Sequence, residues 1–213
     1  IQIEKPNTDE NILADQLKDI FREYGYHAVF GKTQGFYGPY VWKDTIQTTY
    51  FVELPAGTEK FTVNILKNFV FRSWMDYITF GKFGTGGWTS TEGVINCIEQ
   101  AYDFDSEEFQ ISLLKHEAQH AMDMKQYLGI EPEELEYRAK LVEIHYSSKP
   151  DLLLQKFLME ANEDRVSDSH AVASCRIKRE FANCDSADLN AIKKQAIDLF
   201  FAHNKEMQEK YGN

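Results

Sequence analysis

The spacing of apolar residues predicts a helix near the start of the chain. Between positions 12 and 20, isoleucine and leucine residues recur at helical spacing, so one face of the helix would be apolar. Asn7 or Thr8 is the expected N-cap, because a short polar side chain can accept a hydrogen bond from the first helical turn.

The next part of the chain shows strand-like patterns. Residues 40–51 and 60–65 are rich in β-branched and aromatic side chains, and Pro55-Ala56-Gly57 lies between them, which predicts a β-hairpin. Residues 66–80 carry large apolar side chains at helix-like spacing, so a helix is expected there. A glycine-rich loop follows, and residues 88–98 then predict a strand.

Helical patterns dominate the chain after about position 103. A long helix is expected from Ser106 to Leu128, where Gly129 is a natural stop. Pro132 suits the first turn of the next helix, which is expected to reach Tyr146. Two further helices are expected over residues 152–181, with a break, and over residues 187–210.

These patterns predict a single α+β domain over residues 1–213. Eighteen of the 29 aromatic residues fall between Phe21 and Trp88, which marks residues 1–103 as a mixed α/β part. Residues 104–213 form the expected helical part. No Pro/Ser-rich linker separates the two parts, so they are expected to share a core.

The excess of acidic over basic residues limits the classes of molecule that the chain is expected to bind. The chain has 23 Lys and Arg against 34 Asp and Glu, a formal net charge of −11, and no basic run. Nucleic-acid binding depends on basic contacts to phosphates, so nucleic acid is not expected as a partner. Apolar runs are only a few residues long, so no membrane span is expected. Because the chain begins with Ile1, an exported protein is expected, with a cytoplasmic one as the alternative.

The clearest chemical signal is the sequence His116-Glu117-Ala118-Gln119-His120, an HExxH pattern inside the expected helix from Ser106. Residues four apart lie on one helical face, so both imidazoles can bind one zinc ion. Glu117 can then take a proton from a zinc-bound water, whose pKa the metal lowers towards 7. The pattern therefore predicts one Zn²⁺ per chain, with a chance occurrence on a surface helix as the alternative.

An open zinc site needs a third protein ligand. Metzincins would have Gly at position 123 and His at position 126, whereas this chain has Asp123 and Gln126. The remaining common solution is a glutamate on the following helix. The candidates there are Glu133, Glu134, Glu136 and Glu143.

Residues 116–143 thus resemble the gluzincins, the thermolysin-like group of HExxH zinc peptidases. The resemblance implies a zincin-type α+β fold in which a helical glutamate completes the zinc site. Glu136 is the preferred ligand, because Leu135 and Ala139 can pack while it points inward. Glu143 and Glu133 remain alternatives.

Other polar residues are candidates for supporting roles. Asp123 shares the helical face of His116 and His120 and is expected to orient an imidazole, with an ordinary acidic residue near the end of the helix as the alternative. The resemblance implies a histidine downstream of the third ligand that binds the oxyanion, and His170 matches that order. Tyr137 and Tyr146 are the next candidates for this donor.

The zincin resemblance also implies an edge strand upstream of the motif helix that pairs with extended substrate. The segment Gly86–Ile95 lies at the expected position, and Gly87, Trp88 and Thr89 are its predicted substrate-binding residues. The aromatic cluster of residues 36–42, with Phe69, Trp74 and Trp88, is expected to be core, with a carbohydrate or peptide platform as the alternative.

The predicted function is zinc-dependent hydrolysis of peptide bonds in a peptide or protein substrate. One alternative is a non-catalytic zinc-binding protein used in adhesion or regulation. Another is a zinc amidase that acts on a cell-wall crosslink, since the same site would serve that reaction. A purely structural helical domain is the remaining alternative. The sequence indicates neither cleavage specificity nor oligomeric state.

Overall fold

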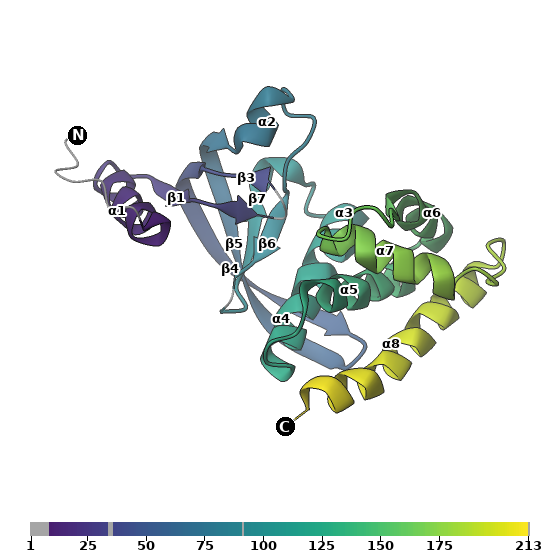
Figure 1. Ribbon diagram of the computed structural model, residues 1–213. Helices are drawn as coiled ribbons and strands as arrows, with labels where there is room; N and C mark the ends of the chain where they lie inside the picture. Colours follow the sequence, from purple (N-terminus) through teal and green to yellow (C-terminus); the bar gives the residue numbers. More distant parts are fainter. Residues whose placement is uncertain (1–8, 34–35, 91, 213) are drawn as a thin grey trace. The chain divides into compact units, whose positions relative to one another are not determined.

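The hairpin predicted around Pro55 is the central feature of the β structure in the computed structural model, which describes residues 9–33, 36–90 and 92–212 (Figure 1). Strand β4 spans Tyr40–Leu54 and β5 spans Gly57–Arg72, so both strands are longer than predicted. They lie in the middle of a curled five-stranded sheet of order β1-β4-β5-β7-β6. Helices complete the chain, so the predicted α+β class is confirmed.

The remaining strands are short. Strand β1, His27–Val29, pairs antiparallel with β4, with His27 opposite Trp42. Strands β6, Gly87–Thr89, and β7, Ile95–Ile98, follow the glycine-rich loop, and β6 forms an edge of the sheet. The predicted strand over 88–98 is therefore two strands joined by a turn. A separate antiparallel pair consists of β2, Lys32–Thr33, and β3, Phe36–Tyr37.

The chain divides into two compact units. The first contains Ile1–Thr48, Asn64–Trp88 and Cys97–Ala101, and the second contains Thr49–Val63, Thr89–Asn96 and Tyr102–Asn213. The tip of the long hairpin and the residues that follow β6 thus belong to the same unit as the helices after residue 102. The predicted division into residues 1–103 and 104–213 is coarser than this arrangement.

The predicted N-terminal helix is present as α1, Glu10–Glu23. Asp9 caps it by accepting a hydrogen bond from the Asn11 N–H at 2.9 Å. The expected N-caps, Asn7 and Thr8, lie outside the described residues.

The prediction of a helix over residues 66–80 is wrong for most of that range. Residues 66–72 continue β5, and only Trp74–Ile78 form a helix, α2. Pairing with the neighbouring strands supplies the backbone hydrogen bonds of residues 66–72, and this tertiary effect overrides an ambiguous local pattern.

The aromatic cluster is largely core, as predicted. Tyr40, Trp42 and Leu66 form a buried cluster, and Phe69 and Trp88 pack against it. Trp74 differs, because 54% of its surface is exposed on α2. The side chains of the aromatic residues 36 and 37 lie outside the described part of the structure.

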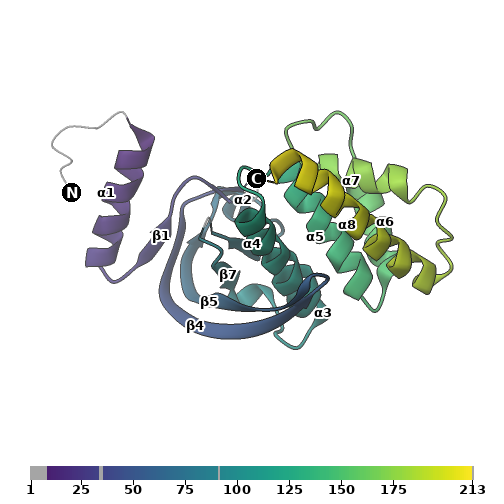
Figure 2. The ribbon, with the colours of Figure 1, turned by 90° about the horizontal axis from the view of Figure 1, so that it is seen from below.

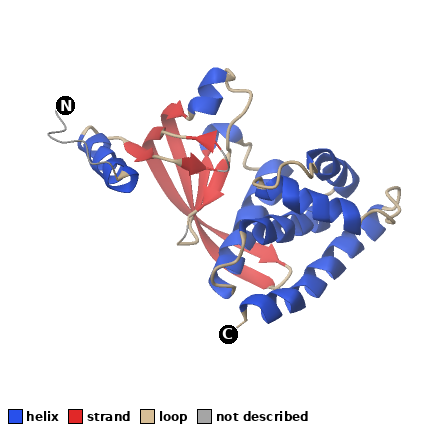
Figure 3. Cartoon of the chain, viewed as in Figure 1, coloured by secondary structure: helices blue, strands red, loops and turns tan. Residues whose placement is uncertain are grey.

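The second unit is helical after residue 102 (Figures 2 and 3). Ser106 caps the motif helix as predicted, by accepting from the Phe109 N–H at 3.2 Å. That helix consists of α3, Glu107–Phe109, a π-helical segment, Gln110–Lys115, and α4, His116–Gln126. The other elements after β7 are a short 3₁₀ helix, Glu99–Ala101, and helices α5, Pro132–Tyr146, α6, Pro150–Glu160, α7, Ser169–Glu180, and α8, Leu189–Tyr211.

Helix α5 is the centre of this unit. It packs against α4, α6, α7 and α8, and Figure 2 shows α7 and α8 lying beside it. Residues 136–144 of α5 are all buried, including four charged residues, so polar groups inside this core need partners from neighbouring helices. No helix among residues 9–33, 36–90 and 92–212 combines the length and apolarity that a membrane crossing needs.

Candidate metal centre

The first two predicted ligands lie at the start of α4. The His116 N–H bonds to the carbonyl of Ile111, five residues earlier, because the π-helical segment ends at this point. His116 and His120 are one turn apart on α4, and their ring centroids lie 4.4 Å apart. The two imidazoles therefore lie on the same face of α4, as predicted.

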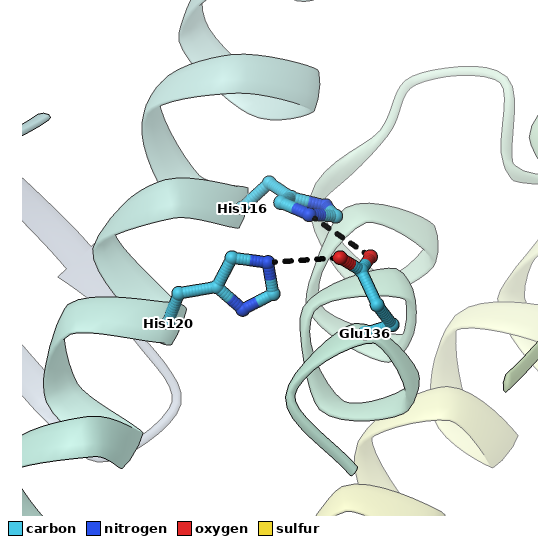
Figure 4. A group of neighbouring side chains, drawn as sticks. All are labelled: His116, His120 and Glu136. Atoms are coloured by element: carbon cyan, nitrogen blue, oxygen red, sulfur yellow. Dashed lines mark ion pairs between the residues drawn. The ribbon is translucent and has the colours of Figure 1, made fainter. Parts of the chain in front are cut away.

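Glu136 on α5 completes the group, and Figure 4 shows all three side chains pointing toward one another. Nε2 of His116 lies 3.4 Å from Oε2 of Glu136, and Nε2 of His120 lies 3.5 Å from Oε1. The ligand atoms of all three residues lie within 4.8 Å of one another.

These distances are compatible with a metal site. An N–H···O hydrogen bond has its heavy atoms about 2.9 Å apart, and contacts near 3.5 Å are weak. Two ligands that each lie about 2.0–2.1 Å from a tetrahedral zinc are about 3.3–3.4 Å apart. The observed separations of 3.4 and 3.5 Å, one to each oxygen of the Glu136 carboxylate, are close to that spacing, so the three residues could hold a metal ion such as zinc.

The group is buried and electrostatically coupled. His116, His120 and Glu136 are only 7–8% exposed. Burial alone would lower the pKa of His116, but hydrogen bonds to Glu136 and Glu143 and their negative charges raise it well above its usual value. Burial would raise the pKa of Glu136, but the His120 charge and the imidazole hydrogen bonds hold it well below its usual value. The carboxylates of Glu136 and Glu143 thus create a negative electrostatic potential around His116, and this potential would also attract a divalent cation.

The outer nitrogen of His120 differs from the rest of the group. Its Nδ1 has no hydrogen-bond partner within the described part of the chain, whereas Oε2 of Glu136 faces Nδ1 of His170. An unpaired buried polar atom costs about 1–3 kcal/mol.

Glu143, the alternative third ligand, contacts a different nitrogen of His116 from the one that faces Glu136. Its Oε1 lies 2.6 Å from Nδ1 of His116, on the side of the ring away from Glu136. Metal-binding histidines commonly donate their second ring N–H to a carboxylate, which fixes the tautomer and the ring orientation. Glu143 therefore orients His116, the role that the sequence suggested for Asp123.

Asp123 pairs with Arg138 of α5 instead. Its Oδ2 accepts from Nε of Arg138 at 2.8 Å, and both side chains are almost completely buried. Asp123 makes no hydrogen bond to His116 or His120 in the described structure. A cation from the neighbouring helix provides a stronger partner for a buried carboxylate than a neutral imidazole does.

His170 lies beside the group. Its Nδ1 is 2.9 Å from Oε2 of Glu136. His170 is not part of the set of three whose ligand atoms all lie within 4.8 Å of one another. Asp168 caps α7 by accepting from the His170 N–H at 3.0 Å. The structure thus brings His170 to the site, in contact with Glu136.

Glu117 and the predicted substrate-binding strand also come together. The Thr89 hydroxyl lies 2.7 Å from Oε2 of Glu117, whose side chain is buried. Trp88 packs against Tyr40 in the core of the first unit, with ring centroids 5.6 Å apart. Gly87 is buried next to Trp88 in edge strand β6. The side chains of Trp88 and Thr89 are thus occupied within the chain.

The remaining candidates lie elsewhere. The Tyr137 hydroxyl donates to Glu180, and Tyr146 is covered by the Lys115 ammonium, 3.8 Å from its ring centre. Glu133 is not part of the candidate ligand group. The contact of Thr89 with Glu117 had no local sequence signal, because 28 residues separate the two positions.

Comparisons of the chain with protein-family models, with curated proteins and with solved structures found no match. The chemistry of this site is therefore the basis for a functional assignment.

Proposed function

We propose that the chain is a zinc-dependent peptidase with a zincin-type fold, in which His116, His120 and Glu136 hold one Zn²⁺. The observation that carries this proposal is the convergence of three buried side chains, whose possible ligand atoms all lie within 4.8 Å of one another. Three protein ligands leave a position open, as in catalytic zinc sites, whereas structural sites are closed by four.

A zinc ion held here would polarise the scissile carbonyl and lower the pKa of a bound water towards 7. Glu117, next to the ligand His116 in the sequence, would act as the general base that takes a proton from the attacking water and passes it to the leaving amine. Glu143 holds the tautomer of His116 through Nδ1, and His170 fixes the position of the Glu136 carboxylate.

Edge strand β6 gives the substrate a backbone to pair with. An extended peptide can bind a sheet edge as an added strand. The Gly87 C=O accepts from the Thr85 hydroxyl at 2.7 Å and the Gly87 N–H donates to it at 3.3 Å, so a peptide that pairs there would displace Thr85. Since the side chains of Trp88 and Thr89 are engaged within the chain, we assign peptide binding at β6 to its backbone.

Peptide-library hydrolysis tests the proposed function. We expect the purified wild-type chain to cleave a subset of a mixed peptide library, to lose that activity after dialysis against a chelator, and to regain it with one equivalent of Zn²⁺. His120→Asn should be inactive before and after zinc addition, because it removes one of three ligands. The matched control is His27→Asn, since His27 is an exposed histidine of β1 outside the site.

Two results would contradict the proposal. Cleavage that survives complete metal removal would exclude a zinc mechanism. Stoichiometric zinc without turnover of any library peptide would instead favour a non-catalytic zinc-binding protein.

A further inference from the structure

The hydroxyl of Thr89 is a hydrogen-bond donor to Glu117, the proposed general base. The Thr89 Oγ1 lies 2.7 Å from Oε2 of Glu117 and 3.0 Å from its backbone carbonyl. A hydroxyl has one proton and can donate only one strong hydrogen bond at a time. Bonds to an ionised carboxylate are shorter and about twice as strong as neutral ones, so the proton belongs to the carboxylate contact.

The backbone around Thr89 keeps this hydroxyl in place. Successive side chains of a strand point to opposite faces, so Trp88 and Thr89 diverge, with Trp88 packed in an aromatic core. A tight turn follows directly, in which the Ser90 N–H donates to the Val94 carbonyl at 2.8 Å. The Val94 N–H in turn donates to Oγ of Ser90 at 3.2 Å. Thr89 is thus anchored on both sides.

A general base needs a fixed carboxylate. The terminal torsion of a glutamate is broad, so the carboxylate plane rotates easily unless a partner holds it. Proton transfer requires a heavy-atom distance of about 2.6–3.2 Å, and an error of about 1 Å in such a group can lower a rate about 100-fold. A hydrogen bond to one carboxylate oxygen removes this rotation.

We propose that Thr89 is a positioning residue that fixes the carboxylate of Glu117, the residue next to the ligand His116 in the sequence. This inference rests on the proposed function, because it concerns the base of the same reaction. It replaces the predicted role of the Thr89 side chain in substrate binding, since its hydroxyl is bound to Glu117. The last side chain of β6 is therefore assigned to the base.

Thr89→Val and Thr89→Ser test this role. Valine has the shape of threonine without the hydroxyl, and serine keeps the hydroxyl. We expect Thr89→Val to lower kcat about 10- to 100-fold with unchanged KM and zinc content. Thr89→Ser should stay within about three-fold of wild type. Thr58→Val, at an exposed position of β5, is the matched control and should behave as wild type.

A second readout needs no substrate. The visible absorption of the Co²⁺-loaded chain reports the surroundings of the metal, and Glu117→Gln provides the reference spectrum for a lost carboxylate. Thr89→Val should shift the Co²⁺ spectrum in the direction of Glu117→Gln, whereas Thr89→Ser and Thr58→Val should leave it unchanged. A merely structural role for Thr89 would not shift the spectrum of a chain that keeps its metal.

The two readouts separate the possible failures. Wild-type kcat together with an unshifted Co²⁺ spectrum in Thr89→Val would overturn the positioning role, while the peptidase proposal would stand. A raised KM with unchanged kcat would also overturn it and restore substrate binding by the side chain. A shifted Co²⁺ spectrum in a chain that cleaves no peptide would support the placement of Glu117 by Thr89 and reject the peptidase.

Discussion

Replacing Glu117 with glutamine is expected to leave zinc bound and to lower kcat by about 10²–10⁴-fold, the usual contribution of a positioned general base. Glutamine has nearly the same shape, and its amide can still meet the Thr89 hydroxyl, which lies 2.7 Å from Oε2 of Glu117. It cannot take a proton from water at neutral pH. His116, His120 and Glu136 are untouched, so the metal content should remain that of the wild type.

Kinetic assays and metal analysis of the same preparations check this expectation. Glu108→Gln is the matched control, because Glu108 is an exposed glutamate earlier in the same helical stretch. The control should keep full activity. Peptidase activity at the wild-type level in Glu117→Gln would refute the assignment of Glu117 as the base.

Replacing Arg138 with leucine is expected to destabilise the chain by about 3–5 kcal/mol, because it leaves the Asp123 charge buried without a partner. Arg138 is 2% exposed and Asp123 is 1% exposed. The Arg138 guanidinium also lies 4.2 Å from the ring centre of Phe200 on α8, so it links α4, α5 and α8. Breaking this pair affects three helices that position the metal site.

Urea unfolding followed by far-UV circular dichroism measures this effect. The double variant Arg138→Leu/Asp123→Leu should recover most of the loss, because both charges are then removed from the interior. The control Arg179→Leu changes an exposed arginine of α7 and should alter the free energy of unfolding by less than about 0.5 kcal/mol. A loss below about 1 kcal/mol in Arg138→Leu would contradict a buried, coupled pair.

The helices were the most predictable part of the fold. Ser106 and Pro132 begin helices where the sequence predicts, since capping and proline chemistry act locally. The π-helical segment before His116 had no such signal, because its residue types are ordinary helix formers. Residues 66–72 were misassigned because the partners that make them a strand lie elsewhere in the chain.

The metal centre was predictable as far as local geometry determines it. The four-residue step between His116 and His120 fixes their common face, and Glu136 meets them as expected. Glu136 and Glu143 are two helical turns apart on α5 and share a face. Which of them meets Nε2 and which meets Nδ1 of His116 depends on how α4 and α5 pack, and no sequence pattern encodes that.

The supporting contacts were the least predictable. Asp123 was assigned to an imidazole because it shares the face of His116 and His120, but Arg138 from the next helix is its partner. Thr89 was assigned to substrate, and its hydroxyl is bound to Glu117 instead. Both contacts join residues from different elements, so only the tertiary structure shows them.

The most direct measurement is the zinc content of the chain, purified without chelator and dialysed against zinc-free buffer, for wild type, Glu136→Ala and Glu143→Ala. A site built from His116, His120 and Glu136 predicts one zinc per wild-type chain and loss of it in Glu136→Ala. Glu143→Ala should retain a site with affinity weakened about 10- to 100-fold, because it removes only the partner of His116 Nδ1. No zinc in the wild type, or a full equivalent in Glu136→Ala, would contradict the proposed metal centre.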